Sequence, residues 1–409
     1  MCVDSKGNIM SDVTDYPRVY LTIDNCFASK RWTAPSEWGG IIKDLGIGYI
    51  ETSADNECDL FYNGPEYFAD WTQKVKETED ALGVKVANLY SGHGTYATLG
   101  LTHDDTRVRD RILNKWLKTM VDTASSLDAG FGFFCHGFNQ TMLQDRQLYG
   151  EALDRLYDDL SHLAKYAAEK GLKTVSLEQM YTPHQVPWTI NGATELMKEV
   201  YGRSASPFYL TIDVGHQCRQ KLYQMPGRDK IGEYLRICRR GQHVENMWLG
   251  PDSAYRIFDE SVSGSQNRDD DAVEKIIDRM TEYPYMFADS EDGDPYKWLG
   301  ELACFSPIIH LQQTDGTFSA HKPFTDDYNK TGIIDGKKIL GAIVHAYKHA
   351  SRESLPPVCE NIYLTIEVFS GTGDMPRDIL RRLQETVNYW RQFVPKDGLS
   401  LDQLFEKEK

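Results

Sequence analysis

Four short segments between residues 175 and 367 each end in a side chain that offers an oxygen donor. Each segment has four residues: an apolar residue, a small or polar residue, a second apolar residue and a residue whose side chain bears oxygen. The oxygen-bearing residues are Glu178, Asp213, Gln312 and Glu367. Three carboxylates buried together without a cation are strongly unfavourable, so their convergence predicts a shared divalent ion. Because all four donors are hard oxygens, Mn²⁺ or Mg²⁺ is favoured over a tetrahedral zinc site, and Co²⁺ is also compatible.

Two histidines accompany these donors. His310 lies two residues before Gln312 on the same face of its segment, and imidazole is the commoner metal ligand, so either residue could complete the set. We expect Gln312 to coordinate because it is nearer the end of the segment, and His310 to lie one layer below. His216 follows Asp213 by three residues, which places its ring within reach of a substrate hydroxyl or oxyanion.

The elements that must hold these donors are eight short β-branched or aromatic runs separated by helical segments. We predict strands at residues 19–24, 47–52, 84–90, 131–136, 173–179, 208–214, 307–313 and 362–368. Eight strands in β/α alternation predict an α/β fold of the (β/α)8 TIM barrel type. Because side chains alternate along a strand, the polar series faces the barrel axis and its last members reach the carboxyl-terminal mouth.

Other polar residues are predicted to line the same mouth and to bind substrate. With His216 and His310, these candidates are Asp24, Glu51, His93, His136, His321 and Lys322. The loop that holds His321 and Lys322 also contains Lys330, and loops after the seventh and eighth strands of barrels often bind phosphate. Either these cations bind a sugar phosphate or they are solvated surface charges, and the sequence leaves both alternatives open.

The chain length suits one catalytic barrel domain, residues 1–409, that carries an insertion. About 90 residues separate the sixth and seventh predicted strands, where a crossover normally needs about 30. We predict an insertion at residues 218–300, acting as a lid or as a contact in a homo-oligomer, with helices near 230–240 and 271–283. The carboxyl-terminal segment, residues 398–409, is predicted to form a surface helix.

Composition excludes several classes of partner. Lys and Arg total 45 against 61 Asp and Glu, a net charge of −16 that argues against binding nucleic acid or an anionic membrane. The eight cysteines show no C-x-x-C spacing, so reduced thiols are expected. No apolar run is long enough to cross a bilayer and the amino terminus lacks a secretory pattern, so we expect a cytoplasmic protein.

The motifs around the predicted donors resemble those of the xylose-isomerase-like TIM barrel family. This family includes sugar and sugar-phosphate isomerases and epimerases, hydroxypyruvate isomerase and the ketose 3-epimerases. The matching motifs are SLEQM around Glu178, IDVGH from Asp213 to His216, HLQQTD at 310–315, TGII at 331–334 and LTIEVF around Glu367. The resemblance implies a divalent metal held by the two glutamates, the aspartate and a His or Gln of the seventh strand.

Both the donor set and the resemblance favour a metal-dependent sugar or sugar-phosphate isomerase or epimerase. A carboxylate would remove the proton beside a metal-polarised carbonyl, and return of a proton to the resulting enediolate would complete the reaction. Glu178 and Glu367 are the predicted acid/base pair, and His216 the predicted oxyanion contact. The alternatives are a lyase or hydrolase on the same barrel, such as keto-glycoside elimination or cleavage of abasic DNA, and a non-catalytic sugar-binding barrel.

Overall fold

Eight parallel strands form a closed ring in the computed structural model, which describes residues 16–53, 63–92, 99–134, 137–264 and 269–406. The strands are β1 (Arg18–Asp24), β2 (Tyr49–Ser53), β3 (Lys85–Ser91), β4 (Gly130–Phe133), β5 (Val175–Glu178), β6 (Tyr209–Asp213), β7 (Ile308–Leu311) and β8 (Asn361–Ile366). Each strand pairs with the next, and β1 closes the ring by pairing with both β8 and β2. The predicted TIM barrel is therefore confirmed.

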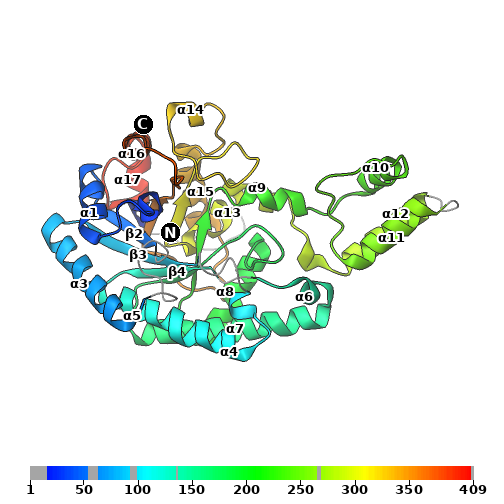
Figure 1. Ribbon diagram of the computed structural model, residues 1–409, viewed down its shortest axis with the longest axis horizontal. Coiled ribbons are helices and arrows are strands. Elements are labelled where there is room, and N and C mark those ends of the chain that lie inside the picture. Colours follow the sequence, from blue (N-terminus) through cyan, green and yellow to red (C-terminus); the bar gives the residue numbers. More distant parts are fainter. Residues whose placement is uncertain (1–15, 54–62, 93–98, 135–136, 265–268, 407–409) are drawn as a thin grey trace, which may run out of the picture.

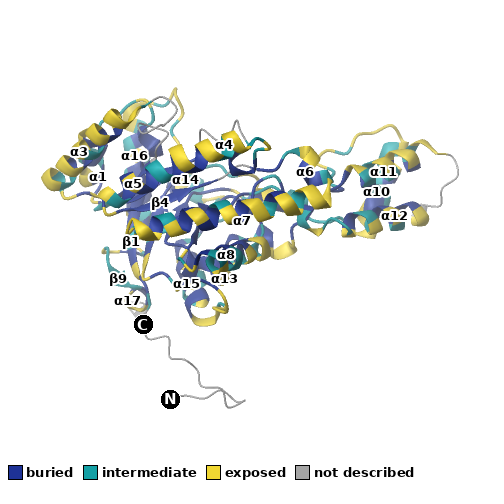
Figure 2. Cartoon of the chain, turned by 90° about the horizontal axis from the view of Figure 1, so that it is seen from below, coloured by how far each residue is buried: buried dark blue, intermediate teal, exposed yellow. Residues whose placement is uncertain are grey.

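Helices cover the outside of the ring (Figure 1). The main ones are α1 (Pro35–Asp44), α3 (Pro65–Leu82), α4 (Thr106–Arg111), α5 (Lys118–Ser126), α6 (Gln140–Gln144), α7 (Arg146–Glu169), α8 (Ile190–Ser204), α9 (Gln217–Gln220), α13 (Pro295–Leu302), α14 (Asp326–Asn329), α15 (Gly336–His349) and α16 (Pro376–Trp390). Local sequence sets their limits: Pro65 begins α3, and Gly83, with φ of 73°, ends it. The longer of these helices, such as α7 and α16, bury one face against the barrel and expose the other (Figure 2).

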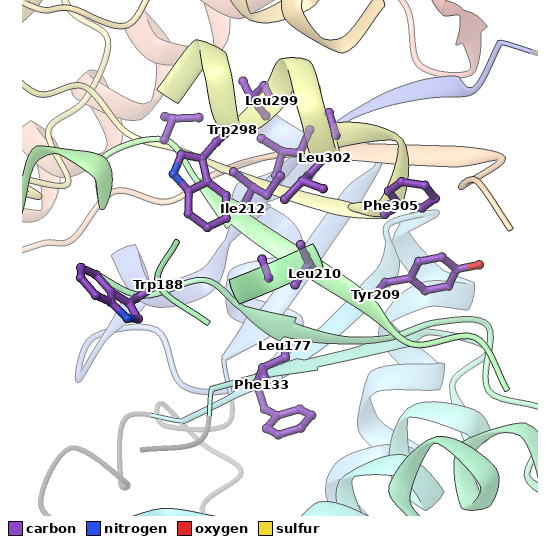
Figure 3. Packing of buried hydrophobic residues seen from close by; sticks show 14 of the residues in the cluster. Phe133, Leu177, Trp188, Tyr209, Leu210, Ile212, Trp298, Leu299, Leu302 and Phe305 are labelled. Atoms are coloured by element: carbon purple, nitrogen blue, oxygen red, sulfur yellow. The ribbon is translucent and has the colours of Figure 1, made fainter. Parts of the chain in front are cut away.

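Strand β6 shows how the alternation of side chains builds the site. Leu210 and Ile212 lie on the outer face of the barrel, where Trp298 and Leu299 of α13 cover them (Figure 3). The intervening residues of β6 point to the interior, so the strand ends with the carboxylate of Asp213 at the mouth. Packing on the outer face thus fixes which residues of β6 face the barrel interior.

The insertion between β6 and β7 forms an arm that projects from the barrel (Figure 1). We define the arm as residues 228–281, which hold α10 (Arg228–Arg239), α11 (Asp252–Ser263) and α12 (Asp269–Thr281). Two of these helices lie where they were predicted, and α11 was not predicted. Ile231, Phe258 and Ile276 are fully or almost fully buried, so the arm has apolar packing of its own. A role as lid or oligomer contact stays a prediction.

The carboxyl-terminal segment differs in part from the predicted surface helix. A short strand, β9 (Leu399–Ser400), pairs antiparallel with the start of β1 outside the ring, and α17 (Leu401–Glu406) follows it. Leu401 is fully buried, so this segment is anchored to the barrel.

No helix in the described part of the chain has the length and apolar character needed to cross a membrane.

Candidate metal centre

Three carboxylates from different strands meet at the carboxyl-terminal mouth of the barrel. Glu178 ends β5, Asp213 ends β6, and Glu367 directly follows β8. One carboxylate oxygen from each of them and one ring nitrogen of His310 all lie within 4.8 Å of one another, and all four residues are buried. The spatial convergence expected from the strand pattern is therefore present.

Gln312 directly follows β7 and joins this cluster. Its Nε2 donates to both carboxylate oxygens of Asp213, at 2.9 Å each, while its Oε1 accepts from the backbone N–H of His321 at 2.6 Å. Asp213, His216 and His321 form a second group of donors whose ligand atoms lie within 4.8 Å of one another. Asp213 thus belongs to both groups and lies at the centre of the site.

His310 lies among carboxylates and has no exposed surface. Its Nδ1 is 2.9 Å from Oε1 of Glu178, and its Nε2 is 2.9 Å from Oε2 of Glu51 on β2. Glu51 is also fully buried and accepts a 2.6 Å hydrogen bond from Asn88 of β3. The contact with substrate that we predicted for His310 and Glu51 stays a prediction, and their burial favours a supporting role below the mouth.

The electrostatics of this group follow from charge pairing in a buried environment. Burial disfavours a charged His310, but the carboxylates of Glu367 and Glu51 outweigh it and raise the pKa of His310 well above its ordinary value. Burial tends to raise the pKa of Glu178, but the hydrogen bond with His310 outweighs burial, and the pKa of Glu178 is lowered. Burial raises the pKa of Glu367 well above the usual range. Not all of these carboxylates are therefore stable as anions side by side.

Glu367 and His321 show that the site fits a cation. Oε2 of Glu367 lies 3.3 Å from Nδ1 of His321, yet neither atom has a hydrogen-bond partner among the described residues. Buried polar atoms are normally paired, and a divalent ion is a partner that can accept lone pairs from both a carboxylate and an imidazole. The orphaned atoms and the oxygen-rich donor set are both compatible with Mg²⁺, Mn²⁺ or Co²⁺.

His216 and His321 both lie beside Asp213 and are held there by different contacts. Nδ1 of His216 lies 2.7 Å from the carbonyl oxygen of Gln179, and its ring meets Tyr181 edge to face at 4.9 Å. Because a carbonyl only accepts, Nδ1 carries a proton and Nε2 faces the site, 3.7 Å from Asp213. His321 stacks on Phe369 at 4.0 Å, and burial lowers its pKa.

The remaining predicted residues have different surroundings. Asp24 is buried at the end of β1 and accepts from the backbone of Cys26, and burial raises its pKa well above the ordinary value. Lys322 lies 5.5 Å above the Tyr328 ring and lines a different hollow from the donors. His93 and His136 lie outside the described residues. A substrate contact for these four residues stays a prediction.

Sequence reasoning missed the residues that hold the donors in place. Tyr90 of β3 donates its hydroxyl to Oε2 of Glu178, and Gln179 donates from Nε2 to the backbone carbonyl of Asp213 at 3.1 Å. Asn88 and Tyr90 are two residues apart in β3 and therefore lie on the same face of the strand. The alternation of side chains along the strand could thus have placed both inside the barrel. Their partners come from other strands, and no local signal identifies them.

The fold and the carboxylate cluster place the chain in a known class of barrel. The sequence model of the xylose isomerase-like TIM barrel family matches residues 40–244, half of the chain. The chain belongs to this family.

Particular relatives are more distant. D-erythrulose 1-phosphate 3-epimerase of Brucella abortus is 28% identical over 107 residues, which are 26% of this chain and 31% of that protein. The chain thus spans about a third of the length of this curated relative. A candidate xylose isomerase from Rhodospirillum rubrum has a similar fold, with a TM-score of 0.65 and 16% identity over 91% of this chain and 99% of that one. A D-tagatose 3-epimerase-like protein gives a TM-score of 0.52 and 12% identity over 95% and 100% of the two chains.

Proposed function

We propose that this chain is a divalent-metal-dependent isomerase or epimerase of a sugar or sugar phosphate that carries an α-hydroxy-carbonyl group. The observation that carries the proposal is the convergence of Glu178, Asp213 and Glu367 within a buried mouth. Family membership and the similarity to D-erythrulose 1-phosphate 3-epimerase support it. That relative also suggests that a ketose phosphate is the first substrate to test.

Glu178, Asp213, Glu367 and Gln312 would hold the ion. Both ring nitrogens of His310 already face carboxylates, which favours Gln312 as the fourth ligand because rotation of its amide would present Oε1 to the cluster. When bound, Mn²⁺, Mg²⁺ or Co²⁺ would polarise the carbonyl of the substrate and thereby acidify the neighbouring C–H.

Glu178 and Glu367 are the proposed proton carriers. Glu178 is fixed by Tyr90 on one oxygen and by His310 on the other, so its orientation is set before substrate arrives. One glutamate removes the proton beside the carbonyl, and the other returns a proton to the neighbouring carbon for isomerisation or to the opposite face for epimerisation. His216 stabilises the developing oxyanion through Nε2, which requires a proton on that atom as well as on Nδ1.

The test is hydrogen exchange with solvent. Protein loaded with Mn²⁺, Mg²⁺ or Co²⁺ is incubated in D₂O with a panel of ketoses and ketose phosphates, beginning with erythrulose 1-phosphate, and deuterium uptake is followed by NMR. We expect uptake at the carbon beside the carbonyl for one member of the panel. Glu178→Gln and Glu367→Gln should each lower the rate by roughly 10³-fold or more, because each removes a proton carrier.

A matched control separates chemistry from folding. Glu353 is exposed in the loop between α15 and β8, at the opposite end of the barrel, so Glu353→Gln should exchange at the wild-type rate. All three variants should keep a cooperative thermal unfolding transition. Retained exchange in both site variants would contradict the proposal, as would nicking of an abasic DNA duplex without exchange on any sugar.

A further inference from the structure

A cavity of about 450 Å³ opens beside the metal centre. Tyr181 and Ser319 line it, and both also contact the donors: Tyr181 meets the ring of His216 edge to face, and Oγ of Ser319 lies 2.9 Å from Nε2 of Gln312. A ligand in this cavity would therefore extend directly to the carboxylate cluster. The volume suits a small sugar derivative.

Arg219 gives this cavity its charge. Of the described residues that line it, Arg219 alone carries a formal charge. Its guanidinium makes no hydrogen bond or ion pair with any residue in the described part of the chain, whereas Arg203 on α8 is paired with three carboxylates. Arg219 is exposed, so its guanidinium can meet an anion that enters the cavity from solvent, and in a chain with a net charge of −16 it offers a cationic contact there.

Two further polar side chains reach the same cavity. Tyr223 and Asn246 line it, and neither the hydroxyl of Tyr223 nor the amide of Asn246 forms a hydrogen bond with a described residue. The Tyr223 ring meets Trp188 and Trp248 edge to face, at 5.9 and 5.0 Å, which fixes its direction. Asn246 comes from the loop between α10 and α11, so the arm contributes directly to the cavity.

We propose that Arg219, with Tyr223 and Asn246, binds the phosphate of a phosphorylated ketose whose reacting carbons lie at the metal centre. The proposal rests on the proposed function and specifies the substrate class. Three donor side chains match the three terminal oxygens of a phosphate monoester better than the two oxygens of a carboxylate. The proposal also places the phosphate beside the segment that follows β6, which holds Arg219 and Tyr223.

The predicted phosphate site in the loop after β7 is less suitable. Lys330 forms a 2.8 Å ion pair with Asp327, and Lys322 lies over the ring of Tyr328. Both cations therefore have contacts already, and neither lines the cavity beside the donors. The guanidinium of Arg219, which pairs with none of the described residues, is the better anion site.

The test compares a ketose phosphate with the corresponding free ketose in wild type, Arg219→Gln and Arg219→Lys. We expect the ratio of their kcat/KM values to fall by roughly 100-fold in Arg219→Gln, and by less in Arg219→Lys, because a charge-assisted bidentate contact is lost or weakened. Arg236→Gln on α10 makes the same charge change at an exposed site on the arm and should leave the ratio unchanged. A ratio that does not change in Arg219→Gln would overturn the proposal.

Binding of inorganic phosphate keeps the test independent of turnover. Calorimetric titration should show phosphate binding to wild type and to Arg236→Gln, and at least tenfold weaker binding to Arg219→Gln. If no sugar turns over but this difference holds, the proposed reaction fails and the anion site stands. Equal phosphate binding by all variants overturns the site. If Arg219→Gln loses activity on a keto-acid sugar but not on a ketose phosphate, the site binds a carboxylate and the phosphate assignment is overturned.

Discussion

Glu51 of β2 and His310 of β7, two strands that are not neighbours in the ring, are joined by a 2.9 Å contact between Oε2 and Nε2, and both residues are fully buried. The other ring nitrogen of His310 lies 2.9 Å from Glu178, so a continuous chain of contacts runs from β2 through β7 to β5. Residues that orient a metal ligand in this way also set its basicity. Glu51 can therefore influence the centre without touching substrate or metal.

Glu51→Gln is expected to weaken metal binding about 10- to 100-fold. The substitution keeps the size of the side chain but removes the negative charge that holds His310, so the orientation of Glu178 becomes less defined. The affinity for Mn²⁺ is measured by calorimetry or electron paramagnetic resonance. Glu353→Gln is the control, and equal affinities in the two variants would show that Glu51 does not support the centre.

Removal of the metal is expected to destabilise the wild-type protein. An ion at a hundred times its dissociation constant contributes about 2.7 kcal/mol, which for a chain of this length lowers Tm by about 3 °C on removal. The shift is measured by calorimetry with Mn²⁺ and after chelation. In Glu178→Gln, the Tm with Mn²⁺ and the Tm after chelation should differ much less than in wild type. The same shift in wild type and in the variant would mean that metal binds elsewhere.

The barrel and the convergence of donors were predictable because both follow from local pattern. The alternation in LTID and LTIE fixes which side chains face inward, and the position of Asp213 and Glu367 at strand ends fixes the mouth. Eight such strands in β/α alternation are the number that a barrel of this type requires. The three carboxylates could therefore be placed together without knowing any contact between them.

The partners of His310 could not be predicted in the same way. Glu51 is 259 residues away, and its approach depends on the tilt and stagger of the strands, which no single segment encodes. The unpaired guanidinium of Arg219 was missed for a related reason. Only the complete fold shows that no carboxylate of the described residues pairs with it and that Asn246 of the insertion lines the same cavity.

The stability of the metal-free protein should depend on pH through His310. Its folded-state pKa is raised, so the stabilisation is fully present below the unfolded value of about 6.5 and is lost as the pH rises through the folded value. We expect the free energy of unfolding of wild type, from urea titrations with chelator, to fall as the pH rises above the unfolded value of His310. It should fall less in His310→Gln, and parallel profiles would contradict this assignment.

Gly215→Ala tests whether Gln312 is a metal ligand. A Cβ at this position would lie 2.4 Å from Cδ and 2.6 Å from Oε1 of Gln312, so the amide that contacts Asp213 must shift. Because the obstructed atoms are the end of a flexible side chain, we expect little change in Tm but at least tenfold weaker Mn²⁺ binding. Gly341→Ala in α15 meets nothing within 4 Å and is the control. Unchanged affinity in Gly215→Ala would instead favour His310, whose contacts with Glu51 and Glu178 the substitution leaves intact.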